Sequence, residues 1–211
     1  MRTIEQIADS ISGPKVDFGC GDWRPIREGF IGIDILPPDR IKQACRDRYI
    51  RANIVDSDDK EIEKLTGRVQ FAVARHLFSA IPRRLAVPAL VNLRKTLAVS
   101  GLLLIADMDL TLLWSAIQQG RGAKAMGRFF ESWFNANKYD DESWHELLNV
   151  GMRGGGDFEI QWRYTRESFA KCLTQAAFKR YEILELDDPR ATSFTHSLPG
   201  EDMVFLCYNA E

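Results

Sequence analysis

The sequence lacks the long apolar segments that membrane proteins need. No stretch of the 211 residues approaches the roughly 18 consecutive apolar residues of a membrane-spanning helix. The amino-terminal residues, Met-Arg-Thr-Ile-Glu-Gln, contain no apolar signal-peptide core. The sequence also has no internal repeat and no low-complexity segment. We therefore expect a soluble, cytoplasmic protein without a membrane partner.

Cysteine is scarce, and there is no excess of positive charge. The four cysteines, Cys20, Cys45, Cys172 and Cys207, form no C-x-x-C pair, so we expect neither a metal site nor a disulfide framework. The 28 Lys and Arg residues and 30 Asp and Glu residues leave a net charge of −2, whereas nucleic-acid-binding domains are usually strongly basic. The charge balance therefore disfavours a nucleic-acid partner.

Apolar residues are numerous enough for one full hydrophobic core. With 45% hydrophobic residues, the chain suits a single domain spanning 1–211. Short apolar segments alternate with amphipathic segments, which is typical of an α/β fold with a parallel sheet. The predicted strands cover 16–18, 30–33, 49–55, 69–74, 101–106, 180–186 and 203–208, and helices are predicted within 1–14, 58–65 and 84–98 and after Thr165.

The most informative stretch runs from Lys15 to Asp34. The predicted strand 16–18 is followed by Gly19-Cys20-Gly21, a turn in which the backbone can approach a ligand without interference from Cβ atoms. The next predicted strand, 30–33, ends at Asp34, whose carboxylate can accept both hydroxyls of a ribose. Because open α/β sheets bind ligands at the carboxyl ends of their strands, we expect a nucleoside-containing ligand across these two ends.

A nicotinamide-dinucleotide site is the first alternative for this stretch. The dinucleotide fingerprint, G-x-G-x-x-G, requires a third glycine, and Arg24 stands at that position. Asp34 also follows Gly19 more closely than the roughly 20 residues expected between the fingerprint and its acidic residue. A pyrophosphate-binding helix would have little room in so short a link. A nucleotide-binding oxidoreductase is therefore the weaker interpretation, and a purely structural turn stays open as well.

The same residues resemble two motifs of a known family. Val-Asp-Phe-Gly-Cys-Gly resembles the first motif of the class I S-adenosylmethionine-dependent methyltransferases, and Ile-Gly-Ile-Asp resembles their second. The resemblance implies S-adenosylmethionine as the cofactor and in-line transfer of its methyl group. It also implies a Rossmann-like fold, with an open, mostly parallel seven-stranded sheet, helices on both faces and the last strand antiparallel. The sequence departs from the family at Trp23, where a third small residue is usual.

The resemblance also assigns residues to the cofactor site. In the family, an acidic or polar residue after the third strand contacts the adenine amino group, and Asp56 has the matching position. Alternatively, Asp56 or Ser57 only caps the next helix. The residues that we predict to bind the cofactor are Asp17, Gly19, Cys20, Gly21, Asp34, Ile35, Asp56, Ser57 and Arg75, and we predict no metal ligand.

His76 is the candidate catalytic residue. The segment from Arg75 to Pro82 resembles a family segment that follows the fourth strand, whose end faces the transferable methyl group. Ser79 and Ala80 stand where the family often has an acidic residue and a second histidine. Histidine suits acid–base work near neutral pH. The alternative is a structural histidine that bonds to a neighbouring loop.

Residues 110–160 interrupt the α/β alternation. A connection of this length is far longer than usual. We predict a mainly helical insertion after the fifth strand, which would act as a lid or bind the acceptor as a cap. Alternatively, its aromatic residues form the insertion's own core or the interface of a homo-oligomer. These aromatic residues are Phe129, Phe130, Trp133, Phe134, Tyr139 and Trp144.

These observations leave three functional hypotheses. The first is an active methyltransferase for a small-molecule or saccharide acceptor; Glu-Gly-Phe-Ile-Gly-Ile-Asp is similar to a motif of methyltransferases associated with sugars. If the acceptor is a hydroxyl, a base must remove its proton, and His76, Asp107 and His145 are the candidates. The second is a catalytically silent cofactor-binding or regulatory module, suggested by Trp23 and Ser79. The third is the oxidoreductase.

Overall fold

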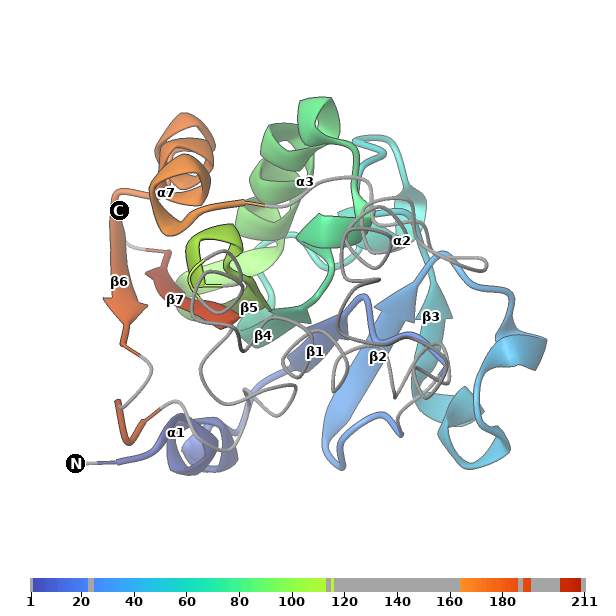
Figure 1. The fold of residues 1–211 in the computed structure, drawn as a ribbon. Coiled ribbons are helices and arrows are strands. Elements are labelled where there is room, and N and C mark those ends of the chain that lie inside the picture. Colours follow the sequence, from blue (N-terminus) through green and yellow to red (C-terminus); the bar gives the residue numbers. More distant parts are fainter. Residues whose placement is uncertain are drawn as a thin grey trace, which may run out of the picture.

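The computed structural model describes residues 2–22, 25–112, 115, 164–185, 188–190 and 202–209. Seven strands in these residues form one mixed sheet in the order β3-β2-β1-β4-β5-β7-β6 (Figure 1). β1 to β5 are parallel to one another, and β7 runs antiparallel to both β5 and β6. The predicted Rossmann-like sheet with an antiparallel last strand is therefore confirmed. The strands are β1 (Lys15–Phe18), β2 (Phe30–Asp34), β3 (Tyr49–Arg51), β4 (Val69–Arg75), β5 (Leu97–Met108), β6 (Arg180–Leu184) and β7 (Asp202–Tyr208).

Helices cover both faces of the sheet, as predicted. α2, α3 and α7 pack on one face, and α1 packs on the other together with the short 3-10 helices that follow β2 (Figure 1). No helix in the described part of the chain is long and apolar enough to cross a membrane. The bounds are α1 (Ile4–Ser10), α2 (Lys60–Glu63), α3 (Arg83–Thr96) and α7 (Arg166–Gln175), with 3-10 helices η1 (Pro38–Arg40), η2 (Gln43–Arg48) and η3 (Phe78–Ala80).

Alternate residues of the central strands pack into two different cores. In β4, Ala72 and Ala74 belong to the core beneath α2, α3 and α7, whereas Phe71 and Val73 belong to the core beneath α1. All four side chains are buried, as expected of a parallel strand that is covered on both faces. Burial on both faces explains why a continuous apolar run, and not an alternating pattern, marks this strand in the sequence.

The direction of the chain connections reverses at β1. The chain passes from β1 to β2 and β3 on one side, whereas β4 and β5 lie on the other side. The carboxyl ends of β1, β2, β4 and β5 therefore meet at one edge of the sheet, with the reversal between β1 and β4. Open α/β sheets bind their ligands at such an edge.

The third strand is shorter than predicted. The predicted strand 49–55 ends at Arg51. Beyond it, backbone groups bond to side chains: Asn53 N donates to the Asp59 carboxylate at 2.8 Å, and Val55 N donates to the Asn53 side-chain oxygen at 3.2 Å. Such local bonds compete with the hydrogen bonds of a sheet, and here they replace them.

The predicted insertion 110–160 lies almost entirely outside the described residues, as do Trp23 and His145. The residues at its two ends are described. Asp109 and Tyr164 form a parallel bridge at the carboxyl end of β5. The chain therefore re-enters the core beside the point where it leaves it, which is compatible with an insertion into a single domain.

Gly32 of β2 is packed too tightly to accept a Cβ. An ideal Cβ there would lie 2.4 Å from Ile26 Cδ1 and 2.9 Å from Cys20 Sγ. We expect Gly32→Ala to lower the free energy of unfolding by roughly 1–3 kcal/mol through overpacking. The sign is informative, because alanine is otherwise favoured over glycine inside a strand. Denaturant unfolding measures the change.

The double variant Ile26→Ala/Gly32→Ala separates packing from backbone effects. Truncating Ile26 removes Cδ1 and Cγ1, the two atoms nearest to the new methyl group. The double variant should therefore lose less stability than the sum of the two single variants. Additive losses would show that Ile26 is not the obstacle.

Candidate active site

Two glycines with left-handed backbone conformations follow β1. Gly19 has a φ of 68° and Gly21 has a φ of 63°, a region that favours glycine. Gly19 N donates to the carbonyl of Ile33 at 2.8 Å, and Gly21 N donates to Asp34 Oδ2 at 2.9 Å. The turn after β1 is thus fastened directly to the end of β2, so Gly19, Gly21 and Asp34 lie together at one edge of the sheet.

The Asp34 carboxylate accepts a backbone hydrogen bond on each oxygen. Oδ2 accepts from Gly21 N at 2.9 Å, and Oδ1 accepts from Leu36 N at 3.2 Å. Burial raises the pKa of Asp34 above its usual value, although the bonds from Gly21 and Leu36 act in the opposite direction. Because a carboxylate oxygen has two lone pairs, each oxygen retains an acceptor position for a ligand hydroxyl.

The hydroxyl of Tyr49, a β3 residue, and the residue Ile35, which follows β2, lie at the carboxyl end of β2. The Tyr49 hydroxyl lies 2.9 Å from the carbonyl oxygen of Asp34 and 2.6 Å from that of Leu36, so it fixes the backbone on both sides of Ile35. Burial, and then the charge of Asp34, raise the pKa of Tyr49, which keeps the hydroxyl protonated as a donor. The Ile35 side chain is 56% exposed and leaves an apolar surface next to Asp34 in the chain.

Gly19 and Cys20 present backbone rather than side chains. Cys20 is buried, and its Sγ would lie 2.9 Å from a Cβ at Gly32, so the thiol packs against β2. A Cβ at Gly19 would lie 2.9 Å from Leu77 Cδ1. The missing side chain of Gly19 thus lets the turn after β1 pack closely against the loop after β4.

A buried ion pair joins β1 and β4. Asp17 is 2% exposed, and its Oδ2 lies 3.3 Å from Arg75 Nη2. Removing one partner of such a pair would leave an uncompensated buried charge. Asp17 and Arg75 therefore already have a structural function, and a contact of either residue with a cofactor stays a prediction.

Asp56 and Ser57 are exposed in the turn after β3. Asp56 Oδ1 accepts from Asp58 N at 3.0 Å, and Ser57 Oγ donates to Asp58 Oδ1 at 3.2 Å. The cap of α2 is Asp59, whose carboxylate accepts hydrogen bonds from backbone N–H groups of the first turn. The alternative in which Asp56 or Ser57 caps this helix is therefore wrong. The helix is also shorter than the predicted 58–65, because α2 spans only Lys60–Glu63.

Asn53 is a polar residue closer to the end of β3 than Asp56. Ala52 N donates to the carbonyl oxygen of Asp34 at 2.9 Å, so the pairing with β2 continues to Ala52. Asn53 comes next and is exposed. Sequence reasoning missed Asn53 because the predicted strand extended to residue 55. The signal that could have found it is Asn53 together with the run Asp-Ser-Asp-Asp at 56–59, residue types that are typical of turns.

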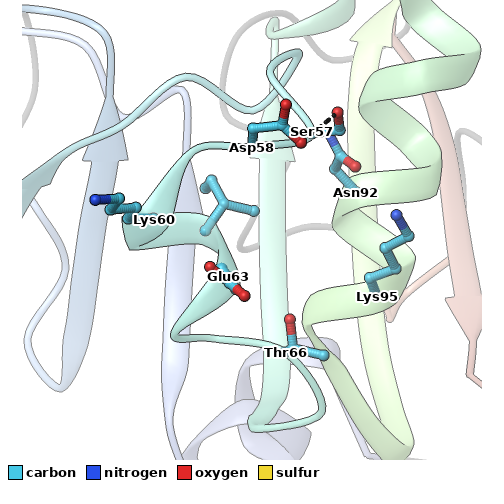
Figure 2. Close-up of a pocket in the computed structure, with 8 residues that line it drawn as sticks. Ser57, Asp58, Lys60, Glu63, Thr66, Asn92 and Lys95 are labelled. Atoms are coloured by element: carbon cyan, nitrogen blue, oxygen red, sulfur yellow. Dashed lines mark hydrogen bonds between the residues drawn. The ribbon is translucent and has the colours of Figure 1, made fainter.

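A hollow of about 360 Å³ lies between α2 and α3 (Figure 2). Figure 2 shows charged side chains of both helices around it. Asn92, one of the lining residues, donates from Nδ2 to the carbonyl of Ile54 at 2.9 Å. The lining belongs to these helices and their adjoining connections and includes no residue of the glycine turn; Ser57 is the one lining residue that is also predicted to bind the cofactor. The lining residues are Ser57, Asp58, Lys60, Ile62, Glu63, Thr66, Asn92 and Lys95.

His76 follows β4 in a left-handed conformation with a φ of 53°. Its N–H donates to the carbonyl of Ala106 at 2.8 Å, and its carbonyl accepts from Ser79 Oγ at 3.1 Å. His76 Nδ1 lies 4.0 Å from Asp107 Oδ1. The buried Asp107 carboxylate accepts from the N–H groups of Ser79 at 3.0 Å and Met108 at 2.9 Å. His76 and Asp107, which the sequence analysis gave as separate candidates for a base, are thus neighbours in the structure.

Asp109, the next carboxylate along the chain, pairs with α7. Its Oδ2 lies 3.0 Å from Arg166 Nε, and its Oδ1 accepts from Thr111 N at 2.9 Å. Arg166 in turn lies 2.8 Å from Glu185 through Nη1. In the described ranges, no group of three or more His, Cys, Asp or Glu residues is arranged to hold a metal ion.

The raised pKa of Asp34 predicts a pH-dependent stability. The folded chain binds the Asp34 proton more tightly than the unfolded chain, whose reference pKa is 3.8. Asp34 therefore adds stability at acidic pH that is lost as the pH rises through its folded-state pKa. We expect the stability of the wild type relative to Asp34→Ala to be greater near about pH 4 than at about pH 7, as measured by urea unfolding.

Asp34→Asn serves as the control for this comparison. The amide is uncharged at every pH, so the wild type should show the same acidic advantage over Asp34→Asn as over Asp34→Ala. A stability advantage of the wild type that grows toward neutral pH would contradict the prediction. It would mean that the backbone hydrogen bonds lower the pKa of Asp34 by more than burial raises it.

No protein-family model and no curated protein matches the sequence. Solved structures match its fold. An S-adenosylmethionine-dependent methyltransferase from Methanosarcina mazei matches with a TM-score of 0.57 and 13% identity, over 100% of this chain and 99% of that chain. A methyltransferase of the same dependence from Archaeoglobus fulgidus matches with a TM-score of 0.52 and 11% identity, over 97% and 90%.

The CurJ carbon methyltransferase matches with a TM-score of 0.55 and 15% identity, over 99% of this chain and 52% of that chain. This chain therefore spans about half of the CurJ methyltransferase chain. All three neighbours share the sheet architecture at low identity, which establishes a common fold. The chain has the fold of the class I S-adenosylmethionine-dependent methyltransferases.

Proposed function

We propose that the protein is an S-adenosylmethionine-dependent methyltransferase that transfers a methyl group in line to a small-molecule or saccharide acceptor. The observation that carries this proposal is the hydrogen bond from Gly21 N–H to the Asp34 carboxylate, beside the reversal of the chain at β1. A glycine turn open to backbone contact and a carboxylate that can accept hydroxyls lie together there. The shared fold of the structural neighbours supports the proposal.

The residues at this edge fit an adenosyl group. Asp34 retains acceptor positions for the two ribose hydroxyls. The exposed Ile35 side chain offers an apolar surface to the adenine ring. Asn53 or Asp56 would then meet the adenine amino group. The other residues that we propose around the cofactor are Asp17, Gly19, Cys20, Gly21, Ser57 and Arg75.

Positioning of the acceptor is the main catalytic task. When bound, S-adenosylmethionine supplies an activated methyl group on a sulfonium. Well-oriented bound reactants can lower a barrier by roughly 7–11 kcal/mol. The ends of β4 and β5, with His76 and Asp107, lie on the side of β1 away from Asp34. We place the acceptor there, with His76 as the catalytic residue.

The described residues weaken the oxidoreductase alternative. A pyrophosphate would need a helix N-terminus after the glycine turn. The described part of the link, residues 22 and 25–29, contains no helix, and Gly21 N–H is bonded to Asp34. The silent cofactor-binding module stays an alternative, because a cofactor could bind here without being consumed.

Asp34→Ala tests the cofactor site. Loss of a charge-assisted hydrogen bond worth about 1.5–3 kcal/mol should weaken the binding of S-adenosylhomocysteine by roughly ten-fold to over one hundred-fold. Titration calorimetry measures this affinity. Asp39→Ala is the matched control, because Asp39 is exposed in η1 and its removal changes the charge equally. If Asp34→Ala binds as tightly as the wild type, the proposed site is wrong.

Turnover separates an active enzyme from a silent module. With S-adenosylmethionine and a cell extract as the acceptor pool, the wild type should release S-adenosylhomocysteine well above the level of Asp34→Ala. Binding without release would favour the silent module.

Asn53→Ala and Asp56→Ala decide which residue meets the adenine. We expect Asn53→Ala to weaken S-adenosylhomocysteine binding by roughly two- to twelve-fold, the loss of one neutral hydrogen bond, and Asp56→Ala to have less effect. Because the Asn53 side chain also accepts from Val55 N, the unfolding free energy of the variant must be checked in parallel. A larger effect of Asp56→Ala would assign the contact to Asp56 instead.

A further inference from the structure

The glycine turn after β1 is not followed by a helix in the described part of the link to β2. Residues 22 and 25–29 of that link contain no helical turn. In doubly wound folds a helix usually begins at this turn and packs closely against the strand. Other parts of the chain therefore have to hold the turn in place.

A salt bridge joins this turn to the 3-10 helix η1. Asp22, the residue after Gly21, accepts on Oδ2 from Arg40 Nη2 at 2.9 Å and from Arg40 Nε at 3.2 Å. Arg40 is the last residue of η1, in the connection between β2 and β3. The two residues are 18 positions apart. The salt bridge thus fastens the connection after β2 to the turn after β1.

The backbone on both sides of Arg40 is itself held in place. η1 begins with Pro37–Pro38, whose rings restrict the φ angles there. Arg46 Nη2 donates to the carbonyl of Asp39 at 2.9 Å, and Arg46 Nε donates to that of Ile41 at 3.0 Å. These two carbonyls belong to the residues on either side of Arg40. The Arg40 side chain therefore extends to the glycine turn from a fixed backbone.

The proposed ribose site depends on the same turn. Gly21 N–H donates to Asp34 Oδ2 at 2.9 Å, and Asp22 is the next residue. Burial is the main cause that raises the pKa of Asp34, and the charge of Asp22 adds to it, so the two carboxylates are close enough to repel each other. The guanidinium of Arg40 places a positive charge beside Asp22, which opposes this repulsion.

We propose that Arg40 is a positioning residue for the cofactor site, which holds the glycine turn through Asp22 and thereby replaces the helix that usually follows such a turn. Arg40 acts through Asp22 and not on the reacting atoms. A turn that is ordered before a ligand arrives binds more tightly, because binding does not have to order it. This inference rests on the proposed function and adds a residue from outside the glycine motif that sets the affinity for the adenosyl group.

Amide hydrogen exchange of the ligand-free protein tests the positioning without any cofactor. Gly21 N–H is bonded to Asp34, and its exchange rate reports how often that bond opens. The Arg40 side chain is 44% exposed and that of Asp22 is 26% exposed, so a modest effect is expected. Arg40→Gln should raise the exchange rate of Gly21 by roughly two- to five-fold, whereas the amides of β4 should exchange as in the wild type. An unchanged rate at Gly21 overturns the proposal.

Titration calorimetry with S-adenosylhomocysteine gives the second readout. Arg40→Gln should weaken binding by roughly two- to five-fold, and Arg40→Lys, which keeps the charge, should recover part of this loss. The loss should shrink when NaCl is raised from about 50 mM to about 500 mM, because salt screens an exposed ion pair. In a protein that already carries Asp22→Ala, Arg40→Gln should leave the affinity unaltered. An equal loss with and without Asp22 overturns the proposal.

Lys42→Gln is the matched control for Arg40→Gln. Lys42 is exposed in the same connection, two residues further along the chain, and its replacement changes the net charge equally. This variant should match the wild type in both readouts. A loss as large as that in Arg40→Gln would mean that the general positive potential is responsible, and the positioning function of Arg40 would be rejected.

The two readouts also separate this inference from the proposed function. If the wild type binds no S-adenosylhomocysteine, the proposed function fails, and the exchange rate of Gly21 still decides whether Arg40 holds the turn. If the wild type binds and Arg40→Gln matches it in both affinity and exchange, only this inference fails.

Discussion

The hydrogen bond from Gly21 N–H to the Asp34 carboxylate fixes the geometry of the sheet edge. A hydrogen bond to an ionised acceptor is stronger than a neutral one. The left-handed conformation of Gly21 places its N–H within reach of the carboxylate. Gly19, bonded to the carbonyl of Ile33, holds the same turn from the other side. These two bonds therefore fasten the turn after β1 to the end of β2.

Much of the fold could be predicted because strands that are buried on both faces appear in the sequence as continuous apolar runs. Alternate residues of β4, such as Phe71 and Ala72, enter different cores, so all four positions from 71 to 74 must be apolar. The end of β3 could not be predicted in this way. Apolar residues continue to Val55, and only the side-chain bonds of Asn53 and Asp59 show that the backbone leaves the sheet after Ala52. Local polar bonds thus decide a boundary that apolar patterning leaves open.

The candidate site likewise has one part that the sequence predicts and one part that it does not. That Gly19, Gly21 and Asp34 lie together could be predicted because they belong to one short stretch of the sequence, whereas their contact with a cofactor stays a prediction. The His76–Asp107 pair could not, because it depends on the pairing of Arg75 with Ala106 in the parallel register of β4 and β5. No spacing rule within one segment conveys that register. Ser79, which departs from the family pattern, takes part in the same arrangement through its N–H bond to Asp107.

The fold shifts the pKa values of two carboxylates, Asp59 and Asp34, in opposite directions. Partial burial acts to raise the pKa of Asp59, but hydrogen bonds from Asn53, Ile62 and Glu61 outweigh it, and the net shift is downward. Asp59 is thus a satisfied helix cap that stabilises the fold as an anion. Burial prevails at Asp34, so the ionised group is held at a cost to the fold. Such a cost is expected where a ligand supplies the missing hydrogen bonds, and two ribose hydroxyls at the free lone pairs of Asp34 would supply them.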